Sequence, residues 1–248
     1  MRKYGGQNHL TMQKDNQKNG ECVRAKKMDK ETIYNGMKKC VLNDYPFEIK
    51  WNDNDIFPIF SACYEDIIQQ HSRINNSYYS CDSGGYLRID FLDHYVILCY
   101  RFAKALYKNN LGNLADAVYY SSRVRCSIDL YYPTEIGECF IPVHALGTIV
   151  DSHAKYGTYF QIYNECHIGP YSYIGKEPKD CIHPVFGDFV TMLGHSRVFG
   201  NTTVGNNVII SAGTVIINEN IPDNCIVSGS SPNLMFQKLK ISNQSIVR

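Results

Sequence analysis

The pattern of apolar residues changes character about halfway along the chain. From Asp29 to about residue 125 the apolar positions recur at spacings of three and four, the period of an amphipathic helix. Asp29 stands before the first of these runs as a candidate N-cap, and Pro58 stands at the start of another. The pattern predicts four helices, which begin at residue 29, cover 58–72, cover 91–109 and begin at 113.

After Cys126 a period of six residues replaces the helical one. Counting in sixes from Tyr156, ten of eleven positions are apolar, whereas a composition of 44% would give about five. The next residue is glycine at five of these eleven positions, and small or β-branched residues stand four places after most of them. The counted positions are Tyr156, Ile162, Ile168, Ile174, Asp180, Phe186, Met192, Val198, Val204, Ile210 and Ile216.

A six-residue period fits neither a helix nor a β-meander, and it is typical of a parallel β-helix built from hexapeptide repeats. Three hexads would make one triangular coil, and successive coils would stack about 4.8 Å apart with the aliphatic residues pointing inward. Asp180 breaks the pattern, so we expect residues 176–183 to be a loop that leaves the coil without loss of phase. The six-residue count also works from Leu130 to Thr148, but offset by two residues, which predicts a bend or an insertion beside His144.

The two patterns together predict an α+β protein, in which an N-terminal α-helical domain precedes a parallel β-helix of hexapeptide repeats. We expect the helical domain over residues 29–125 and the β-helix over 126–233. Residues 1–28 are basic and poor in apolar residues, so we expect a disordered tail, and 234–248 are expected to be a C-terminal tail.

Composition narrows the classes of function. The chain of 248 residues has 25 Lys and Arg against 24 Asp and Glu, so nothing in its net charge of +1 favours nucleic acid as a partner. There is no signal-peptide pattern and no run of eighteen apolar residues, so we expect a cytoplasmic protein without a membrane partner. The ten cysteines contain no Cys-x-x-Cys pair, and we interpret them as reduced core thiols.

Short motifs where the two regions join are similar to those of the serine acetyltransferase family, one of the hexapeptide-repeat acyltransferases. The resemblance covers about residues 90–235, and it implies a left-handed β-helix, a homotrimer or a dimer of trimers, and acetyl-CoA bound between neighbouring barrels. The segments that carry it are Tyr100-Arg101-Phe102-Ala103-Lys104-Ala105-Leu106-Tyr107, Ser127-Ile128-Asp129, His144-Ala145-Leu146-Gly147 and His183-Pro184-Val185-Phe186-Gly187-Asp188.

Transfer of an acetyl group from a thioester to a hydroxyl needs a base that takes the hydroxyl proton, and histidine suits that role. By the resemblance, His144 is the candidate base, and Asp129 is its partner carboxylate, which would fix the tautomer and stabilise the imidazolium. His183 would lie across the cleft and bind the acceptor or the tetrahedral oxyanion. The transfer would be direct, without an acyl-enzyme.

The side chains predict the coenzyme contacts less directly, because most such contacts come from backbone groups. We expect no metal cofactor. The candidate coenzyme-binding residues in the last coils and after them are Gly194, Ser196, Ala212, Gly213 and Lys238.

Two departures from the family's pattern concern the acceptor. Val143 and Ile182 occupy the positions where the family has an aspartate for the ammonium group of serine and an arginine for its carboxylate. Without these two charged partners, the family resemblance favours a less charged acceptor, such as a sugar or polysaccharide hydroxyl. The aromatic side chains that could stack on a sugar are Tyr131, Tyr132, Tyr163 and Tyr171. The chain ends in Ser245-Ile246-Val247-Arg248 rather than isoleucine, so we do not expect it to dock with cysteine synthase.

Three alternatives stay open. The first is an L-serine O-acetyltransferase of cysteine biosynthesis that holds its amino acid with other residues. The second is a zinc carbonic anhydrase on the same kind of barrel, with His167, His183 and His195 as metal ligands at the trimer interface. The third is a non-catalytic hexapeptide scaffold.

Overall fold

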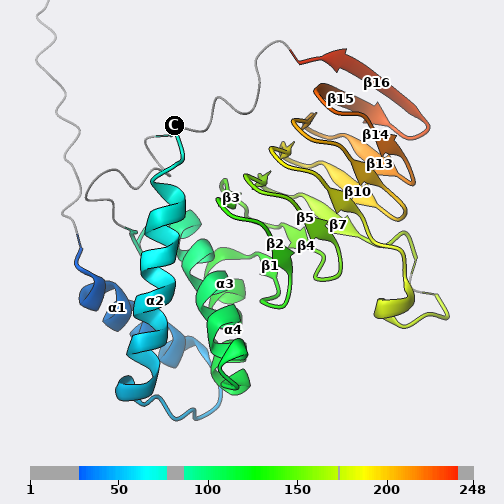
Figure 1. Cartoon of the computed structure of the whole chain (residues 1–248). Helices are drawn as coiled ribbons and strands as arrows, with labels where there is room; N and C mark the ends of the chain where they lie inside the picture. Colours follow the sequence, from blue (N-terminus) through cyan, green and yellow to red (C-terminus); the bar gives the residue numbers. More distant parts are fainter. Residues whose placement is uncertain (1–27, 77–86, 173, 240–248) are drawn as a thin grey trace, which may run out of the picture.

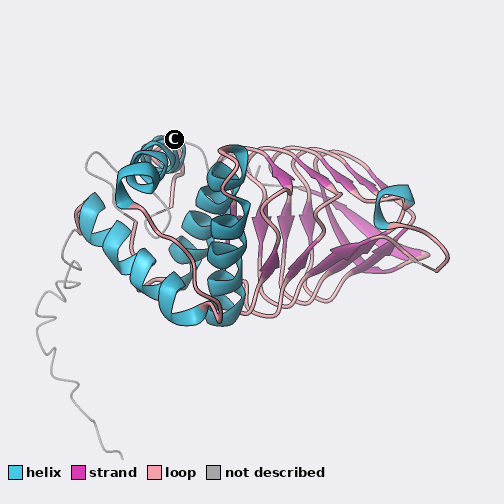
Figure 2. Cartoon of the chain, turned by 90° about the horizontal axis from the view of Figure 1, so that it is seen from below, coloured by secondary structure: helices cyan, strands magenta, loops and turns pink. Residues whose placement is uncertain are grey.

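The computed structural model describes residues 28–76, 87–172 and 174–239, and it places a helical unit at one end of a β-solenoid (Figures 1 and 2). The predicted α+β fold class and the parallel β-helix are confirmed. Residues 1–27 of the expected N-terminal tail lie outside the described residues. The helices are α1 (Lys30–Asp44), α2 (Asp53–His71), α3 (Leu92–Lys108) and α4 (Gly112–Cys126).

Helix α2 begins five residues before the predicted start at Pro58. Asn52 caps it, and its side chain accepts a hydrogen bond from the backbone N–H of Asn54 at 3.1 Å. Pro58 therefore lies inside the helix, near its N-terminus, where its missing N–H removes a single backbone hydrogen bond. By contrast, the predicted N-cap of the first helix is confirmed, since Asp29 accepts from the N–H of Thr32 at 2.7 Å. None of the described helices is both long and apolar enough to cross a bilayer.

The strands form three parallel ladders, one for each side of a triangular coil. The first contains β1 (Asp129–Leu130), β4 (Ile149–Val150), β7 (His167–Gly169), β10 (Arg197–Phe199) and β13 (Val215–Ile217). The second contains β2 (Glu135–Ile136), β5 (Lys155–Tyr156), β8 (Val185–Phe186), β11 (Thr203–Val204) and β14 (Asn220–Ile221). The third contains β3 (Ile141–Pro142), β6 (Gln161–Ile162), β9 (Thr191–Met192), β12 (Ile209–Ile210) and β15 (Cys225–Ser230).

The register of these ladders accounts for the six-residue period. Phe186 pairs with Val204 in the next coil, eighteen residues along, so a regular coil contains three hexads. The inward residues stack on one another, as the rings of Tyr156 and Phe186 do with an interplanar angle of 7°. The apolar positions counted in sixes are buried, apart from those in one loop.

That loop joins β7 to β8 and contains the 3-10 helix η1 (Pro178–Asp180) (Figures 1 and 2). Ile168 pairs with Val198 thirty residues along, which is twelve more than in a regular coil, and twelve residues are two hexads. The prediction of a loop that keeps the phase is therefore confirmed. The loop is longer than predicted, because Ile174, counted as a core position, is 91% exposed within it.

A second irregularity lies beside His144, as the offset in the sequence predicts. Leu130 pairs with Val150, and Pro142 pairs with Ile162, so the first coil repeats after twenty residues instead of eighteen. The two extra residues enlarge the turn between β3 and β4. This turn contains both His144, with φ of +47°, and Gly147, with φ of +69°.

Helix α3 closes the open end of the solenoid with the residues of one of the quoted motifs. The hydroxyl of Tyr100 and the Nζ of Lys104 each donate to the carbonyl of Thr134 at 2.6 Å. The guanidinium of Arg101 donates to the carbonyls of Ile136 and Gly137 at 3.2 and 2.6 Å. These bonds satisfy carbonyl groups of the first coil that have no earlier coil to pair with, which protects an exposed sheet edge.

The opposite end of the solenoid is closed by a hairpin. Residues 234–238, expected in a C-terminal tail, belong to β16 (Asn233–Lys238), which pairs antiparallel with β15. The sequence of this strand lacks the six-residue period, so the period did not predict the strand.

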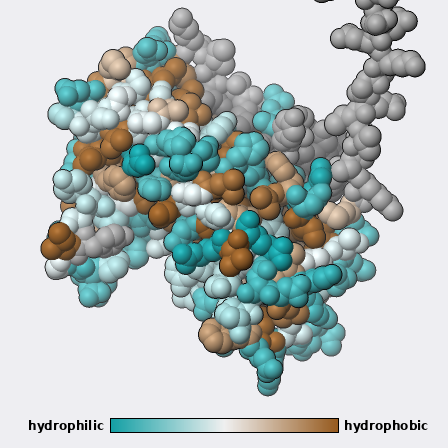
Figure 3. Space-filling view, turned by 180° about the vertical axis from the view of Figure 1, so that it is seen from behind, coloured by the Kyte–Doolittle hydropathy of each residue, from teal (hydrophilic) through white to brown (hydrophobic). Residues whose placement is uncertain are grey.

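On the face turned away from the viewer in Figure 1, polar and apolar side chains are interspersed (Figure 3).

Candidate functional site

His144 projects from the enlarged turn between β3 and β4, and its side chain is 75% exposed. Its backbone N–H faces the carboxylate of Asp93, at 3.0 Å from both oxygens. Its imidazole Nδ1 lies 3.7 Å from Asp93 Oδ2. The carboxylate of Asp93 therefore holds the backbone of the turn, and the accessible imidazole of His144 lies beside it.

Asp93 comes from the first turn of α3, and its side chain is 5% exposed. A carboxylate is favoured at this place, because the N-terminus of a helix carries partial positive charge. The carboxylate lies at a pocket of about 210 Å³ between the helix and the turn. The pocket is lined by Asp90, Phe91, Leu92, Asp93, Val96, Cys126, His144, Ala145 and Leu146.

Cys126 is the thiol in this pocket, and its environment keeps it protonated. Burial raises its pKa to about 12, and the negative charge of Asp93 contributes to the increase. A thiol with this pKa is almost entirely uncharged at neutral pH, so it is not a nucleophile there. The candidate acid–base groups of the pocket are therefore the imidazole of His144 and the carboxylates of Asp90 and Asp93.

Asp129, the predicted partner of His144, contacts two residues of α4. The hydroxyl of Tyr119 donates to Asp129 Oδ1, and Arg123 Nη2 lies 3.7 Å from Asp129 Oδ2. Burial raises the pKa of Tyr119, and the hydrogen bond to Asp129 raises it further, so this hydroxyl stays a donor. Within the described residues, the carboxylate in contact with His144 is that of Asp93, and the pairing of Asp129 with His144 stays a prediction.

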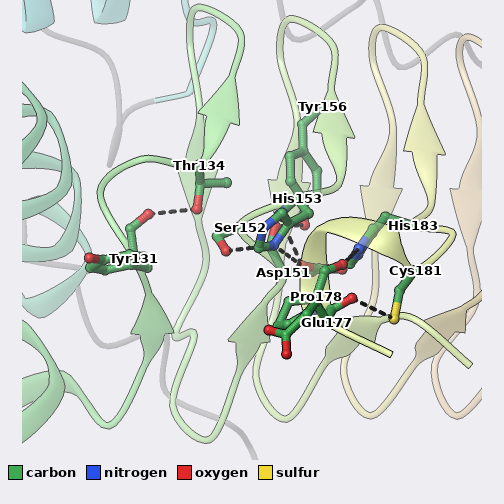
Figure 4. Close-up of polar contacts among 10 residues, drawn as sticks. All are labelled: Tyr131, Thr134, Asp151, Ser152, His153, Tyr156, Glu177, Pro178, Cys181 and His183. Carbon is green, nitrogen blue, oxygen red and sulfur yellow. Dashed lines mark hydrogen bonds and ion pairs between the residues drawn. The ribbon is translucent and has the colours of Figure 1, made fainter. Parts of the chain in front are cut away.

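His183 lies in a second polar group, where the long loop meets the coil (Figure 4). Its Nδ1 is 2.5 Å from Asp151 Oδ2, and its Nε2 is 2.7 Å from the carbonyl oxygen of Pro178. The ring of His153 stacks on it, with 4.9 Å between centroids and 23° between planes. The side chain of Asp151 is buried, that of His183 is 9% exposed, and that of His153 is 43% exposed.

The other predicted site residues lie on the solenoid and around it. Val143 is half-buried and packs against the small apolar cluster of Ile74, Cys139 and Ile141, whereas Ile182 is exposed on the long loop. Tyr131 packs against Tyr119 and Tyr132 with tilted rings, and Tyr171 is exposed.

The predicted coenzyme-binding residues fall on two consecutive coils and on the terminal hairpin. Gly194 and Gly213 occupy equivalent turns, and the N–H of Gly213 donates to the carbonyl of Gly194 at 3.0 Å. Ser196 is buried against the Cys166 sulfur at 3.4 Å, whereas Ala212 and Lys238 are exposed, Lys238 at the end of β16. Their role in binding a coenzyme stays a prediction.

The trio of histidines considered as zinc ligands is not assembled within the described part of the chain. His195 Nδ1 lies 3.0 Å from Glu165 Oε2, and His167 lies on β7. His183 instead faces Asp151 and His153, two residues the sequence did not single out. The sequence gives no signal that separates His153 from the other histidines, because only the folding of the long loop onto the turn after β4 brings it to His183.

Asp93 was missed for a different reason. It lies 51 residues from His144 in the sequence, and only the packing of α3 against the first coil joins them. An aspartate in a first helical turn gives a signal of helix capping, not of a site.

Curated relatives of the chain are serine acetyltransferases, although no profile of a known protein family matches it. The enzyme from Synechococcus elongatus is 26% identical over 141 residues, which are 57% of this chain and 56% of that protein. The enzyme from Bacillus subtilis is 28% identical over 59% of this chain and 65% of its own length. The chain thus spans under two thirds of these two relatives, and it spans 80% of the enzyme from Buchnera aphidicola at 25% identity.

Solved structures of serine acetyltransferases share the fold. The Neisseria gonorrhoeae protein superposes with a TM-score of 0.61 at 20% identity, covering 85% of this chain and 80% of that one. The Vibrio cholerae protein gives a TM-score of 0.59 at 21% identity, covering 79% and 72%. A soybean serine acetyltransferase complexed with serine gives a TM-score of 0.57 at 21% identity, covering 72% and 70%. At these identities the superpositions establish the fold alone. The sequence matches show in addition that the chain resembles serine acetyltransferases in sequence.

Proposed function

We propose that this serine acetyltransferase-like chain is an acetyl-CoA-dependent O-acetyltransferase whose acceptor is L-serine. The observation that carries the proposal is the pocket in which His144 meets Asp93, at the position of the His-Ala-Leu-Gly motif. Acetyl-CoA as the donor is supported by the relatives' name and by a solved serine acetyltransferase complex with CoA that shares the fold, with a TM-score of 0.55.

His144 acts as the general base in this proposal. Its exposed ring can reach a hydroxyl that enters the pocket and take its proton as the oxygen attacks the thioester carbonyl. The carboxylate of Asp93, 3.7 Å from Nδ1, then stabilises the imidazolium. The thiolate of coenzyme A leaves with the proton that His144 returns, so no acyl-enzyme is needed.

The choice of serine revises our expectation of a sugar acceptor. That expectation rested on Val143 and Ile182, which carry no charge. Asp93 restores a buried carboxylate beside the base from another element, and an ammonium group is its natural partner. The relatives named serine acetyltransferase support the same choice, and a pocket of about 210 Å³ suits a small acceptor.

Further roles belong to the same proposal. His183 would bind the acceptor or the oxyanion, and Gly194, Ser196, Ala212, Gly213 and Lys238 would line the coenzyme site. A homotrimer would complete the cleft, and light scattering of the purified chain would measure that assembly.

The test is release of free thiol from acetyl-CoA with L-serine and, at equal concentration, with a panel of sugars and nucleotide sugars. We expect turnover with L-serine. Turnover with a sugar and none with serine would overturn the choice of acceptor but keep acetyl transfer. If nothing is acetylated and coenzyme A does not bind, the chain is a scaffold and the proposal fails.

A further inference from the structure

We propose that Asp151, His153 and His183 form a binding site for a divalent transition-metal ion, with zinc as the ion of choice. One donor atom from each residue lies within 4.8 Å of the other two. The residues come from the turn after β4 and from the end of the long loop, 32 positions apart in the sequence for Asp151 and His183 (Figure 4). The site stands apart from the His144 pocket, its test does not depend on acetyl transfer, and it would take the place of the acceptor-binding role given above to His183.

The hydrogen bonds of His183 indicate that a cation belongs at its Nδ1. The carbonyl oxygen of Pro178, 2.7 Å from Nε2, can only accept, so Nε2 carries a proton. In the neutral ring Nδ1 then has a lone pair, and it faces Asp151 Oδ2 at 2.5 Å, which also only accepts. Two acceptors come this close when a proton lies between them, and a metal ion can take the place of that proton once the two atoms move apart.

His153 distinguishes between these two species. Its Nδ1 lies 3.8 Å from the other carboxylate oxygen, Asp151 Oδ1, and its ring stacks on that of His183. A proton on Nδ1 of His183 accounts for one imidazole, but it gives no role to a second imidazole directed at the same carboxylate. A divalent ion accepts one lone pair from each ring and one from the carboxylate, and so uses all three groups.

The separations fit such an ion after small movements. Zinc bonds of about 2.0–2.2 Å place neighbouring ligands of a tetrahedron about 3.4 Å apart. The measured separations of 2.5 and 3.8 Å lie on either side of that value, so a rotation of the Asp151 carboxylate brings Oδ1 to the ion. The Ser152 hydroxyl, 3.2 Å from His153 Nδ1, is the group that the ion would displace.

The surroundings of the ligands are those of a built site. The Nε2–H of His183 donates to a backbone carbonyl, the second hydrogen bond that metal-binding histidines usually make. Two hydrogen bonds fix Asp151. The hydroxyl of Tyr156 donates to its backbone carbonyl at 3.0 Å, and the backbone N–H of His153 donates to its Oδ1 at 3.0 Å. The exposed ring of His153 gives the ion a path from solvent and leaves a fourth position open.

The donor set selects the class of ion. Two imidazole nitrogens and one carboxylate oxygen suit zinc and its first-row neighbours, whereas magnesium and calcium prefer oxygen ligands alone. This inference departs from our expectation of no metal, which had weighed only His167, His183 and His195 as ligands.

The test is equilibrium dialysis of the full chain, stripped with a chelator, against zinc chloride, with the bound metal measured by mass spectrometry. We expect one zinc per chain, and we expect His153→Ala and Asp151→Asn each to weaken binding by about 100-fold. His153 is exposed, so its replacement removes a ligand without creating a cavity.

Two matched variants exclude unspecific binding. His195→Ala removes an exposed histidine outside the cluster, and Cys181→Ser removes a thiol of the long loop, and both should bind zinc as the unmodified chain does. Cobalt in place of zinc should give visible absorption that His153→Ala abolishes. No bound zinc, or equal binding by His153→Ala and His195→Ala, would overturn the proposal and leave a protonated His183 on Asp151.

Discussion

At the scale of single residues, the candidate pocket depends on a carboxylate that replaces one absent from the sequence motif. Val143 precedes the candidate base where a charged neighbour would be expected, and Asp93 reaches the same histidine from α3. A buried carboxylate in contact with an accessible imidazole is an arrangement that both supports a general base and attracts a cationic substrate.

The base is tested by His144→Ala. We expect it to lower the rate of acetyl transfer by about 100- to 10,000-fold, because general base catalysis contributes that much. Binding of coenzyme A should not change, and calorimetric titration would serve as the control. A turnover close to that of the unmodified chain would show that another group takes the proton.

Asp93→Asn tests the acceptor. We expect kcat/KM for L-serine to fall by about 30-fold or more, the effect of removing one partner of a buried charge pair. N-acetyl-L-serine lacks the ammonium group, so its much poorer turnover should change less. Equal losses for both acceptors would assign Asp93 to His144 alone.

At the scale of elements, the solenoid is regular where hexads stack and departs from that rule at two turns. Glycines stand in a column where neighbouring coils approach most closely, and a Cβ on Gly157 would lie 2.4 Å from the carbonyl oxygen of Gly187. The two irregular turns are the ones that carry His144 and His183, so both candidate site histidines lie where the repeat is interrupted.

Gly157→Ala tests this packing. We expect a loss of about 1–3 kcal/mol in the free energy of unfolding, because the backbone of the adjacent coil has to move. The matched control is Gly112→Ala at the start of α4, where a Cβ meets nothing within 4 Å. Denaturant titration of both variants makes the comparison, and a similar stability for the two would contradict the close approach.

At the scale of the whole molecule, one apolar core runs from the helices into the solenoid, and it buries ionisable thiols. Burial raises the pKa of Cys126 to about 12 and that of Cys99 well above its ordinary value of 9.0. In the unfolded chain both thiols lose their protons near the ordinary value. The folded state keeps its full stability with respect to these thiols below pH 9. It loses stability as the pH rises towards 12, because the unfolded chain gives up the thiol protons more readily.

We accordingly expect the free energy of unfolding to fall above pH 9 by about 1.4 kcal/mol per pH unit for each of these thiols. Urea titrations at a series of alkaline pH values would measure the slope. Cys99→Ala should remove one thiol's share of it, and a slope that stays unchanged in this variant would refute the assignment.

The sequence by itself determined the fold class, because a six-residue period and a helical period each depend on local spacing alone. It also located the enlarged turn at His144 and the long loop. An insertion of two residues shifts the six-residue count, and an insertion of whole hexads leaves the count in phase but places a polar residue on it, and both effects are visible in the sequence alone. The partners of the two histidines were decided only by the tertiary structure. Asp93 reaches His144 because α3 packs on the first coil, and Asp151 and His153 reach His183 because the long loop folds back onto the turn after β4. No local period records such contacts between segments far apart in the chain.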